Sequence, residues 1–260
     1  MDINRREIYR YLGIKTNMEP DAATEQLAEE CIRELAEKCR PRAYARWFPL
    51  RVCEEPGAAG QAAGTGETAG AGKAQDASDS PLLDFSCFQV RSRSLAKNLQ
   101  GCSEVILFAA TIGEGADLLA RKYGRINVAK AVVMQASAAA MIEAFCDEEN
   151  EKLRAEAAEK GLYLRPRFSP GYGDFSLDHQ RDFARVLEMQ KTVGITLTES
   201  LLMLPSKSVT AVIGVSRQDA RCVLSGCESC ENTGCAFRRE WDLEEAAGGR
   251  CMVGTGVRTE

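Results

Sequence analysis

The segment from Arg167 to Gly173 combines residue types that suit a ligand-binding turn. It reads Arg-Phe-Ser-Pro-Gly-Tyr-Gly and contains the pattern Arg-x-x-x-Gly-Tyr. The arginine supplies a rigid fork of donors for a carboxylate, and the glycines permit positive φ and a close approach of a ligand to the main chain. Tyr172 adds a flat apolar face with a polar tip. The set suits an amino-acid carboxylate beside a flat ring. The alternative is a surface turn whose arginine makes an ordinary ion pair.

A second block follows a polar helical segment and reads Thr198-Glu199-Ser200-Leu201-Leu202-Met203-Leu204-Pro205. We interpret its first three residues, Thr198, Glu199 and Ser200, as a supporting loop. In this interpretation the carboxylate of Glu199 fixes the loop by accepting hydrogen bonds from backbone amides. A structural role for Glu199 is favoured over a direct role at a ligand.

Residues 127–160 are predicted to form one long helix whose inner face carries small side chains and one carboxylate. At about 100° per residue, Val132, Ala136, Ala139 and Ala140 lie on the same side as Glu143. Small residues permit the close approach of a ligand or a second backbone. A carboxylate on such a face needs a cationic partner, because burying it alone is costly. That partner is either Arg167, in an internal ion pair, or the ammonium group of a ligand.

The turn and the second block, in this order and at nearly this spacing, resemble the activation (reactivation) domain of cobalamin-dependent methionine synthase. Glu143-Ala144-Phe145 is similar to a Glu-Ala-Phe triplet of that family, and Phe108-Ala109-Ala110-Thr111 looks like the end of one of its strands. The resemblance spans roughly residues 104–216. It implies that the chain binds S-adenosylmethionine and supports the re-methylation of an oxidised corrinoid, so that S-adenosylmethionine and cobalamin are the implied cofactors.

The resemblance also implies roles for individual residues. Glu143 would hold the ammonium group of the methionine moiety, and Arg167 would hold its carboxylate or adjacent backbone carbonyls. Pro170 and Gly171 would form the close main-chain contact, and Tyr172 would sit on the corrin side. No catalytic base is implied, because no proton moves at the methyl centre.

The chain departs from the family at several positions. Leu204 stands where the family has an aromatic residue before the proline, and Arg217-Gln218-Asp219 stands where it has a tyrosine pair. The D-x-H-x-x-G motif of a corrinoid-binding region is absent from the sequence, whose single histidine is His179. The resemblance therefore implies a free-standing activation subunit that acts on a separate corrinoid-binding methionine synthase subunit. An electron donor such as a flavodoxin or ferredoxin is a further candidate partner.

Four cysteines near the C-terminus form the pattern C-x4-C-x2-C-x4-C: Cys222, Cys227, Cys230 and Cys235. Four thiolates in a loop-rich stretch suit tetrahedral zinc or a four-cysteine iron–sulfur cluster, and spacing does not decide between the two metals. The alternative is a set of reduced thiols without a metal. The methionine synthase domain does not carry this cluster.

Three functions stay open at the level of the sequence. The first is the S-adenosylmethionine-binding activation subunit described above. The second is a redox module whose cysteine-ligated centre delivers electrons to a corrinoid protein. The third is a non-enzymatic module that binds S-adenosylmethionine or docks a corrinoid protein.

Composition excludes several classes of protein. The chain has 260 residues, 45% hydrophobic content and a net charge of −5, which argues against a general nucleic-acid binder. The N-terminus lacks the apolar run of a signal peptide. The longest apolar region carries Lys130, Gln135 and Glu143, so we expect it to be too polar to cross a membrane. Eleven cysteines without a secretion signal indicate free thiols and a cytoplasmic location.

The order of predicted elements favours an α+β fold with a twisted, largely antiparallel sheet and long helices. We expect a first part at residues 1–100, a core similar to the activation domain at 101–218, and a cysteine-rich tail at 219–260. Gly113-Glu114-Gly115 is interpreted as a tight strand-to-helix turn, since it lacks the third glycine and the lysine of a phosphate cradle. The predicted helices are 3–12, 21–39 (with Asp21 as its N-cap), 94–99, a helix from Ala116, 127–160 and 178–193. The predicted strands are 43–52 (an edge strand), 85–90 (returning after a disordered insertion at 54–81), 104–110 and 208–216.

Overall fold

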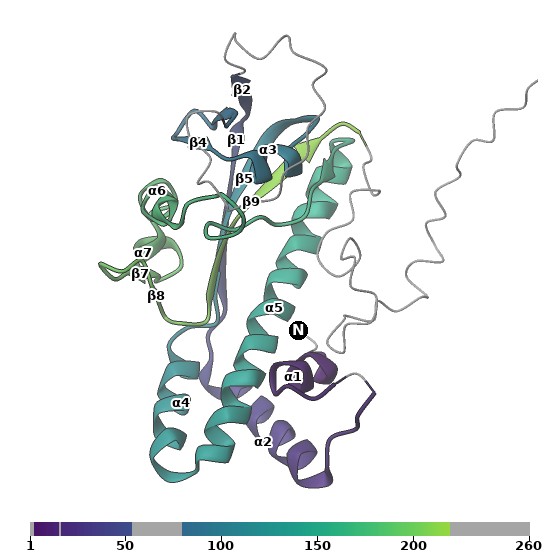
Figure 1. The fold of residues 1–260 in the computed structure, drawn as a ribbon, viewed down its shortest axis with the longest axis vertical. Helices are drawn as coiled ribbons and strands as arrows, with labels where there is room; N and C mark the ends of the chain where they lie inside the picture. The colour runs from purple at the N-terminus through teal and green to yellow at the C-terminus, as the bar shows by residue number, and fades with distance from the viewer. Residues whose placement is uncertain (1–2, 16, 54–79, 219–260) are drawn as a thin grey trace, which may run out of the picture.

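The computed structural model describes residues 3–15, 17–53 and 80–218, and a four-stranded antiparallel sheet forms its centre (Figure 1). β5 pairs with β1 on one side and with β9 on the other, and β9 also pairs with β6. This mixture of helices and antiparallel strands confirms the predicted α+β class. The strands are β1 (Arg42–Pro49), β5 (Cys102–Thr111), β6 (Tyr163–Leu164) and β9 (Ser208–Ser216).

The central strand β5 is buried on both faces, because a different hydrophobic core covers each one. Side chains alternate along a strand, so Ile106 and Phe108 join one core while Val105 and Leu107 join the other. The first core is closed by α1 (Arg5–Tyr11), α2 (Ala22–Lys38), α4 (Gly115–Ile126) and α5 (Val128–Glu159). The second core is closed by α3 (Arg93–Asn98), α6 (Gln180–Val186) and α7 (Met189–Thr192).

The predicted long helix is α5, which begins after Asn127 and runs the length of the molecule (Figure 1). The side chain of Asn127 caps it by accepting a 3.0 Å hydrogen bond from the amide of Lys130. The predicted inner face was wrong at one position: Val132 is exposed, and the neighbouring Val133 is buried instead. By length and composition α5 could cross a membrane, contrary to our expectation, but half of its apolar window is buried inside the protein. That is the position of a core helix.

Two other predicted elements differ from the structure near the N-terminal strand. The predicted strand 43–52 divides at Leu50, whose amide donates to the carbonyl of Ser103, into β1 and β2 (Arg51–Cys53). Its position at the edge of the main sheet is confirmed. Of the predicted strand 85–90, residues 85–88 form a turn between β3 (Leu82–Asp84) and β4 (Gln89–Arg91), and only its last two residues lie in β4. β3 and β4 form a small sheet with β2. The proposed insertion joins β2 to β3, and residues 54–79 lie outside the described ranges.

The predicted helix 178–193 breaks into a 3-10 turn at Leu177–His179, then α6 and α7. Glu188 lies between α6 and α7 with φ +48°. The buried residues explain the break. Phe183 and Leu187 are four apart, but Met189 follows after only two positions and begins a second buried pair with Val193. One straight helix would place the two pairs about 120° apart around its axis, so the chain turns at Glu188 to bury both.

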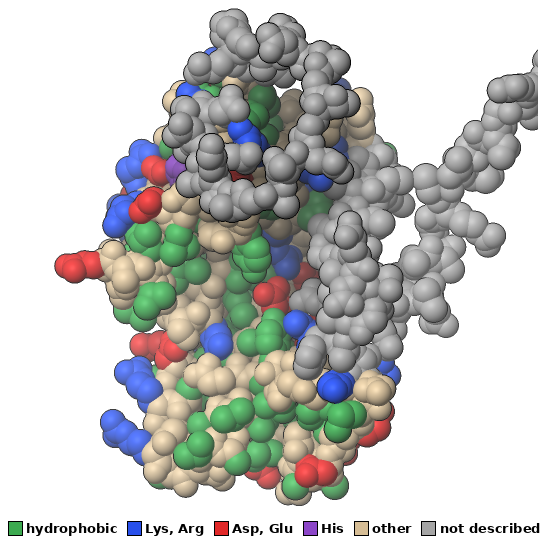
Figure 2. All heavy atoms as spheres, viewed as in Figure 1, with side chains coloured by type: hydrophobic (Ala, Val, Ile, Leu, Met, Phe, Trp, Pro, Cys, Tyr) green, Lys and Arg blue, Asp and Glu red, His purple; other side chains and the backbone are tan. Residues whose placement is uncertain are grey.

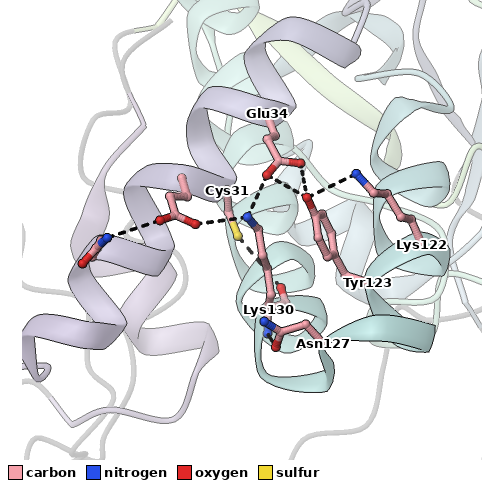
Figure 3. Close-up of polar contacts among 8 residues, drawn as sticks. Cys31, Glu34, Lys122, Tyr123, Asn127 and Lys130 are labelled. Atoms are coloured by element: carbon pink, nitrogen blue, oxygen red, sulfur yellow. Dashed lines mark hydrogen bonds and ion pairs between the residues drawn. The ribbon is translucent and has the colours of Figure 1, made fainter.

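A polar network joins α2, α4 and α5 at one end of the molecule (Figure 3). The ammonium group of Lys130 lies 2.7 Å from Glu34 and 3.1 Å from Glu30, and the Tyr123 hydroxyl donates to both carboxylate oxygens of Glu34. The Lys130 side chain is only 12% exposed. Its hydrogen bonds to Glu34 and Glu30 outweigh burial and raise the pKa of Lys130. The network therefore fixes the packing of α2 against α4 and α5, which lie about ninety residues further along the chain.

Replacing Lys130 by methionine is expected to lower the free energy of unfolding by about 1–2 kcal/mol, because two carboxylates lose their cation in a partly buried site. Urea unfolding near neutral pH measures this effect. The matched control is Lys152→Met on the same helix, whose ammonium group is exposed beside Glu148 and Glu149. The control is expected to cause no measurable change. Equal losses in the two variants would contradict a special role for the Lys130 network.

Candidate functional site

The predicted ligand-binding turn is attached to the main sheet through Phe168. The amide of Phe168 donates to the carbonyl of Val212 in β9, and the amide of Val212 donates back, each over 2.9 Å. The chain then reverses at Gly171, whose amide donates to Phe175 over 2.7 Å. Gly171 and Gly173 have φ +95° and +56°, so both need the conformational freedom that the sequence predicted for them.

The carboxylate of Asp174, which the sequence analysis did not identify, attaches the turn to the start of α3. Asp174 accepts hydrogen bonds from the Ser92 hydroxyl (2.6 Å) and from the amides of Arg93 (2.7 Å) and Ser94 (3.0 Å), which open α3. Burial alone would raise the pKa of Asp174, but these hydrogen bonds lower it to about 2. Gly173 packs so closely on this helix that an added Cβ would lie 2.6 Å from the Ser94 hydroxyl oxygen.

The depressed pKa of Asp174 predicts a stability difference that depends on pH. Asp174→Asn is expected to lower the free energy of unfolding by about 1 kcal/mol near neutral pH, after allowance for the exposure of this carboxylate to solvent. The contribution is present above the unfolded pKa of about 4 and is lost as the pH falls through about 2. Urea unfolding across this range measures it, with Asp178→Asn as an exposed control. A deficit that stays constant down to a pH of about 2 would contradict the assignment.

The guanidinium group of Arg167 lies against α5, between two carboxylates. Its Nη2 is 2.8 Å from Oδ1 of Asp147 and 3.5 Å from Oε2 of Glu143. The sequence left two partners open for Glu143, namely Arg167 and the ammonium group of a ligand, and the structure contains the ion pair with Arg167. Asp147 was missed, although it lies one helical turn beyond Glu143 and so shares its face. Arg167 is 20% exposed and Glu143 is 36% exposed, so both groups remain accessible to a ligand.

One face of the molecule is concave. Figure 2 shows a hollow between α5 and the side of the molecule that carries α6, α7 and the hairpin of β7 (Thr196–Leu197) and β8 (Met203–Leu204). Gln135 of α5 and Leu204 of β8 line one cavity, and none of Glu143, Asp147, Arg167 and Tyr172 lines it. On α5, Ala136 and Ala140 are buried in the core that α5 shares with α1, α2 and α4. Tyr172 is 68% exposed at the turn.

The second block forms the β7–β8 hairpin, and its supporting loop is closed by Thr198. The Thr198 hydroxyl accepts from the amide of Leu202 over 3.0 Å and bonds to the Ser200 hydroxyl. The expected role of Glu199 was therefore wrong: within residues 80–218 its exposed carboxylate has no hydrogen-bond partner. The conformation of the loop is instead fixed by a local hydrogen bond between a threonine hydroxyl and a nearby backbone amide.

The four cysteines of the predicted metal site, Cys222, Cys227, Cys230 and Cys235, lie outside the described residues. Within the described ranges, no group of three or more histidine, cysteine, aspartate or glutamate side chains is placed to hold a metal ion. The metal site stays a prediction from the sequence.

Comparisons with known proteins match the region that contains this site. The family described as "Vitamin B12 dependent methionine synthase, activation domain" matches residues 94–223, which is half of the chain. A solved structure described as "Crystal Structure of the MetH Reactivation Domain bound to AdoHcy" is similar in fold, with a TM-score of 0.51 and 18% identity over 83% of this chain and 75% of that one. No curated protein matches. The chain belongs to the family of the activation domain of vitamin B12-dependent methionine synthase.

Proposed function

We propose that this chain binds S-adenosylmethionine between the Arg167 turn and α5, and that it supports the reductive re-methylation of the corrinoid of cobalamin-dependent methionine synthase. The observation that carries the proposal is the placement of Arg167 between Glu143 and Asp147, inside the region that matches the family. The similar reactivation domain is described as bound to AdoHcy, which shares the amino-acid and adenosyl groups of S-adenosylmethionine.

The charges of the site suit this ligand. Two carboxylates and one guanidinium leave a local net charge of −1. The amino-acid end of S-adenosylmethionine carries an ammonium and a carboxylate, and its sulfonium adds a second positive charge. Glu143 and Asp147 would take the ammonium group, and Arg167 would take the carboxylate through a charge-assisted pair. Binding would therefore replace the internal ion pair of Arg167 with ion pairs between the protein and the ligand.

The chain's contribution to the reaction is position and electrostatics. The reduced corrinoid supplies the nucleophile, and the sulfonium supplies the methyl group. Glu143 and Arg167 hold the amino-acid end of the donor, Pro170 and Gly171 provide main-chain contact, and the exposed Tyr172 ring lies on the corrin side. Thr198 and Ser200 support the opposite wall of the hollow. None of these residues acts as a base, because no proton moves at the methyl centre.

We propose further that the corrinoid is carried by a separate methionine synthase subunit in the cytoplasm, with a flavodoxin or ferredoxin as electron donor. The sequence lacks the D-x-H-x-x-G motif, and its single histidine is otherwise engaged. His179 bonds Asp182 over 2.9 Å and stacks on Phe88 at 5.8 Å between ring centroids. It is thus a packing residue beneath the turn.

The decisive experiment mixes the chain with a methionine synthase subunit that carries cob(II)alamin, and follows the absorption spectrum. Methylcobalamin that forms only with the chain, S-adenosylmethionine and an external reductant supports the proposal. Reduction of the corrinoid without a methyl donor would favour the redox module instead. Binding of S-adenosylmethionine with neither reaction would reduce the chain to a binding module.

The cysteine tail gives a prediction that is independent of the methyl donor site. Cys222, Cys227, Cys230 and Cys235 are expected to hold one metal centre, either colourless zinc or a coloured iron–sulfur cluster. Metal analysis and visible absorption of anaerobically purified protein distinguish the two. Replacing Cys227 and Cys230 by serine together is expected to remove the metal and to leave S-adenosylmethionine affinity unchanged. Protein purified from metal-replete cells without any metal would contradict the prediction.

A further inference from the structure

A cavity of about 820 Å³ is lined by residues of α2, β1, α4 and β8 and carries several basic side chains. Its cations come from three elements that are separate in the sequence. Lys38 ends α2, Arg42 begins β1, and Arg121 lies on α4, with Arg40 between the first two. All four are exposed, so their charged groups are open to a ligand. The opposite wall is apolar and includes Leu204 and Pro205.

Two carboxylates line this cavity, Glu114 and Asp117, and within the described residues neither forms an ion pair with its cations. Asp117 accepts hydrogen bonds from the amide and the hydroxyl of Ser206, so it holds the β8–β9 connection. Within the described part of the chain, Lys38, Arg42 and Arg121 form no ion pair, whereas many cations elsewhere on the surface have a carboxylate within 4 Å. In a chain with a net charge of −5, unpaired cations gathered around one cavity indicate that an anion is to be bound there.

The shape of the cavity favours a small molecule. Its volume lies in the range of ligand pockets, about 300–1,000 Å³. Gly194 lies beside Arg42, since a Cβ at that position would be 3.8 Å from Nη1 of the guanidinium. Arginine forks match phosphate oxygens in pairs. On α5, Gln135 at the cavity is eight residues, or roughly 12 Å, from Glu143.

We propose that this cavity binds a small phosphate-bearing molecule at a site separate from that of the methyl donor. Lys38, Arg42 and Arg121 hold the phosphate oxygens, and the Leu204–Pro205 wall packs against the remainder of the molecule. The assignment does not depend on the proposed methyl transfer, because none of these side chains belongs to the Glu143–Arg167 site.

Calorimetric titration with pyrophosphate tests the proposal. The unmodified protein is expected to bind one equivalent, and Arg42→Gln or Arg121→Gln is expected to weaken binding about 10-fold each through the loss of a charge-assisted hydrogen bond. The matched control is Arg33→Gln, an exposed arginine of α2 that does not line the cavity; its affinity is expected to equal that of the unmodified protein. Melting temperatures of the variants verify that each is folded.

Three results would overturn the proposal. Titration without saturable heat would show that the cavity binds no phosphate. An equal loss in Arg33→Gln would show a diffuse effect of charge. Displacement of S-adenosylmethionine by pyrophosphate would show that the two ligands share one site. The S-adenosylmethionine affinity of Arg42→Gln tests whether the two sites are independent. It is expected to be unchanged whether or not methyl transfer is observed.

Discussion

Replacing Arg167 by alanine is expected to weaken S-adenosylmethionine binding roughly 10- to 100-fold, which corresponds to about 1.5–3 kcal/mol for a hydrogen bond to a charged group. The change removes the only cation that the structure places between Glu143 and Asp147 within the described residues. The ligand carboxylate would then face two carboxylates without a partner. Calorimetric titration measures the two affinities directly.

Two variants make this result specific. Arg154→Ala removes an arginine that lies on α5 itself, seven positions beyond Asp147, where it pairs with Glu151, and the affinity of this variant is expected to be unchanged. Arg167→Lys keeps the charge and loses the planar fork, so its affinity is expected to fall between those of the alanine variant and the unmodified protein. If Arg167→Ala and Arg154→Ala bind equally well, Arg167 is not part of the site.

Gly173→Ala is expected to reduce S-adenosylmethionine affinity by more than about 10-fold, because the new methyl group collides with α3 and displaces the turn that carries Tyr172. The added Cβ would lie 2.6 Å from Oγ and 2.9 Å from Cβ of Ser94, distances that a rotation of the hydroxyl alone cannot relieve. Positive φ adds a strain of about 1 kcal/mol for any residue with a side chain.

Gly161→Ala separates strain from collision. Gly161 has φ +67° and no atom within 4 Å of an added Cβ, so this variant carries the strain alone and is expected to lose stability but not affinity. The double variant Gly173→Ala with Ser94→Gly removes the colliding side chain and is expected to recover most of the binding. If Gly173→Ala binds S-adenosylmethionine with the affinity of the unmodified protein, close packing of the turn on α3 is not required for binding.

The sequence predicted those elements whose signal is local and continuous. β5, α5 and β9 were predicted within a few residues, because each has an uninterrupted apolar pattern and clear ends, such as the Asn127 cap of α5. The helix predicted at 178–193 failed because its buried residues change phase at Met189, which a search for apolar content alone does not register.

The sequence identified site residues whose partners can be inferred from opposite charge. It missed site residues whose partners come together only in the folded chain. The ion pair between Glu143 and Arg167 was one of two alternatives for Glu143, and the structure contains it. Asp174 was missed because its partners, the amides that open α3, lie about eighty residues away in the sequence. Glu199 was expected to bond backbone amides of its loop. The hydroxyl of the preceding residue, Thr198, accepts the hydrogen bond from the amide of Leu202 instead.

The attachment of the ligand-binding turn through Phe168 and Val212 has a consequence for solvent exchange of backbone protons. The amides of Phe168 and Val212 donate to one another's carbonyl groups. Deuterium can therefore replace either proton only when the turn separates from β9. The exchange rates of these two amides therefore measure one opening equilibrium. Beyond the bridge, the amides of Gly171 and Tyr172 donate hydrogen bonds within the turn. The turn is thus held at one end by β9, through Phe168, and at the other by α3, through Asp174.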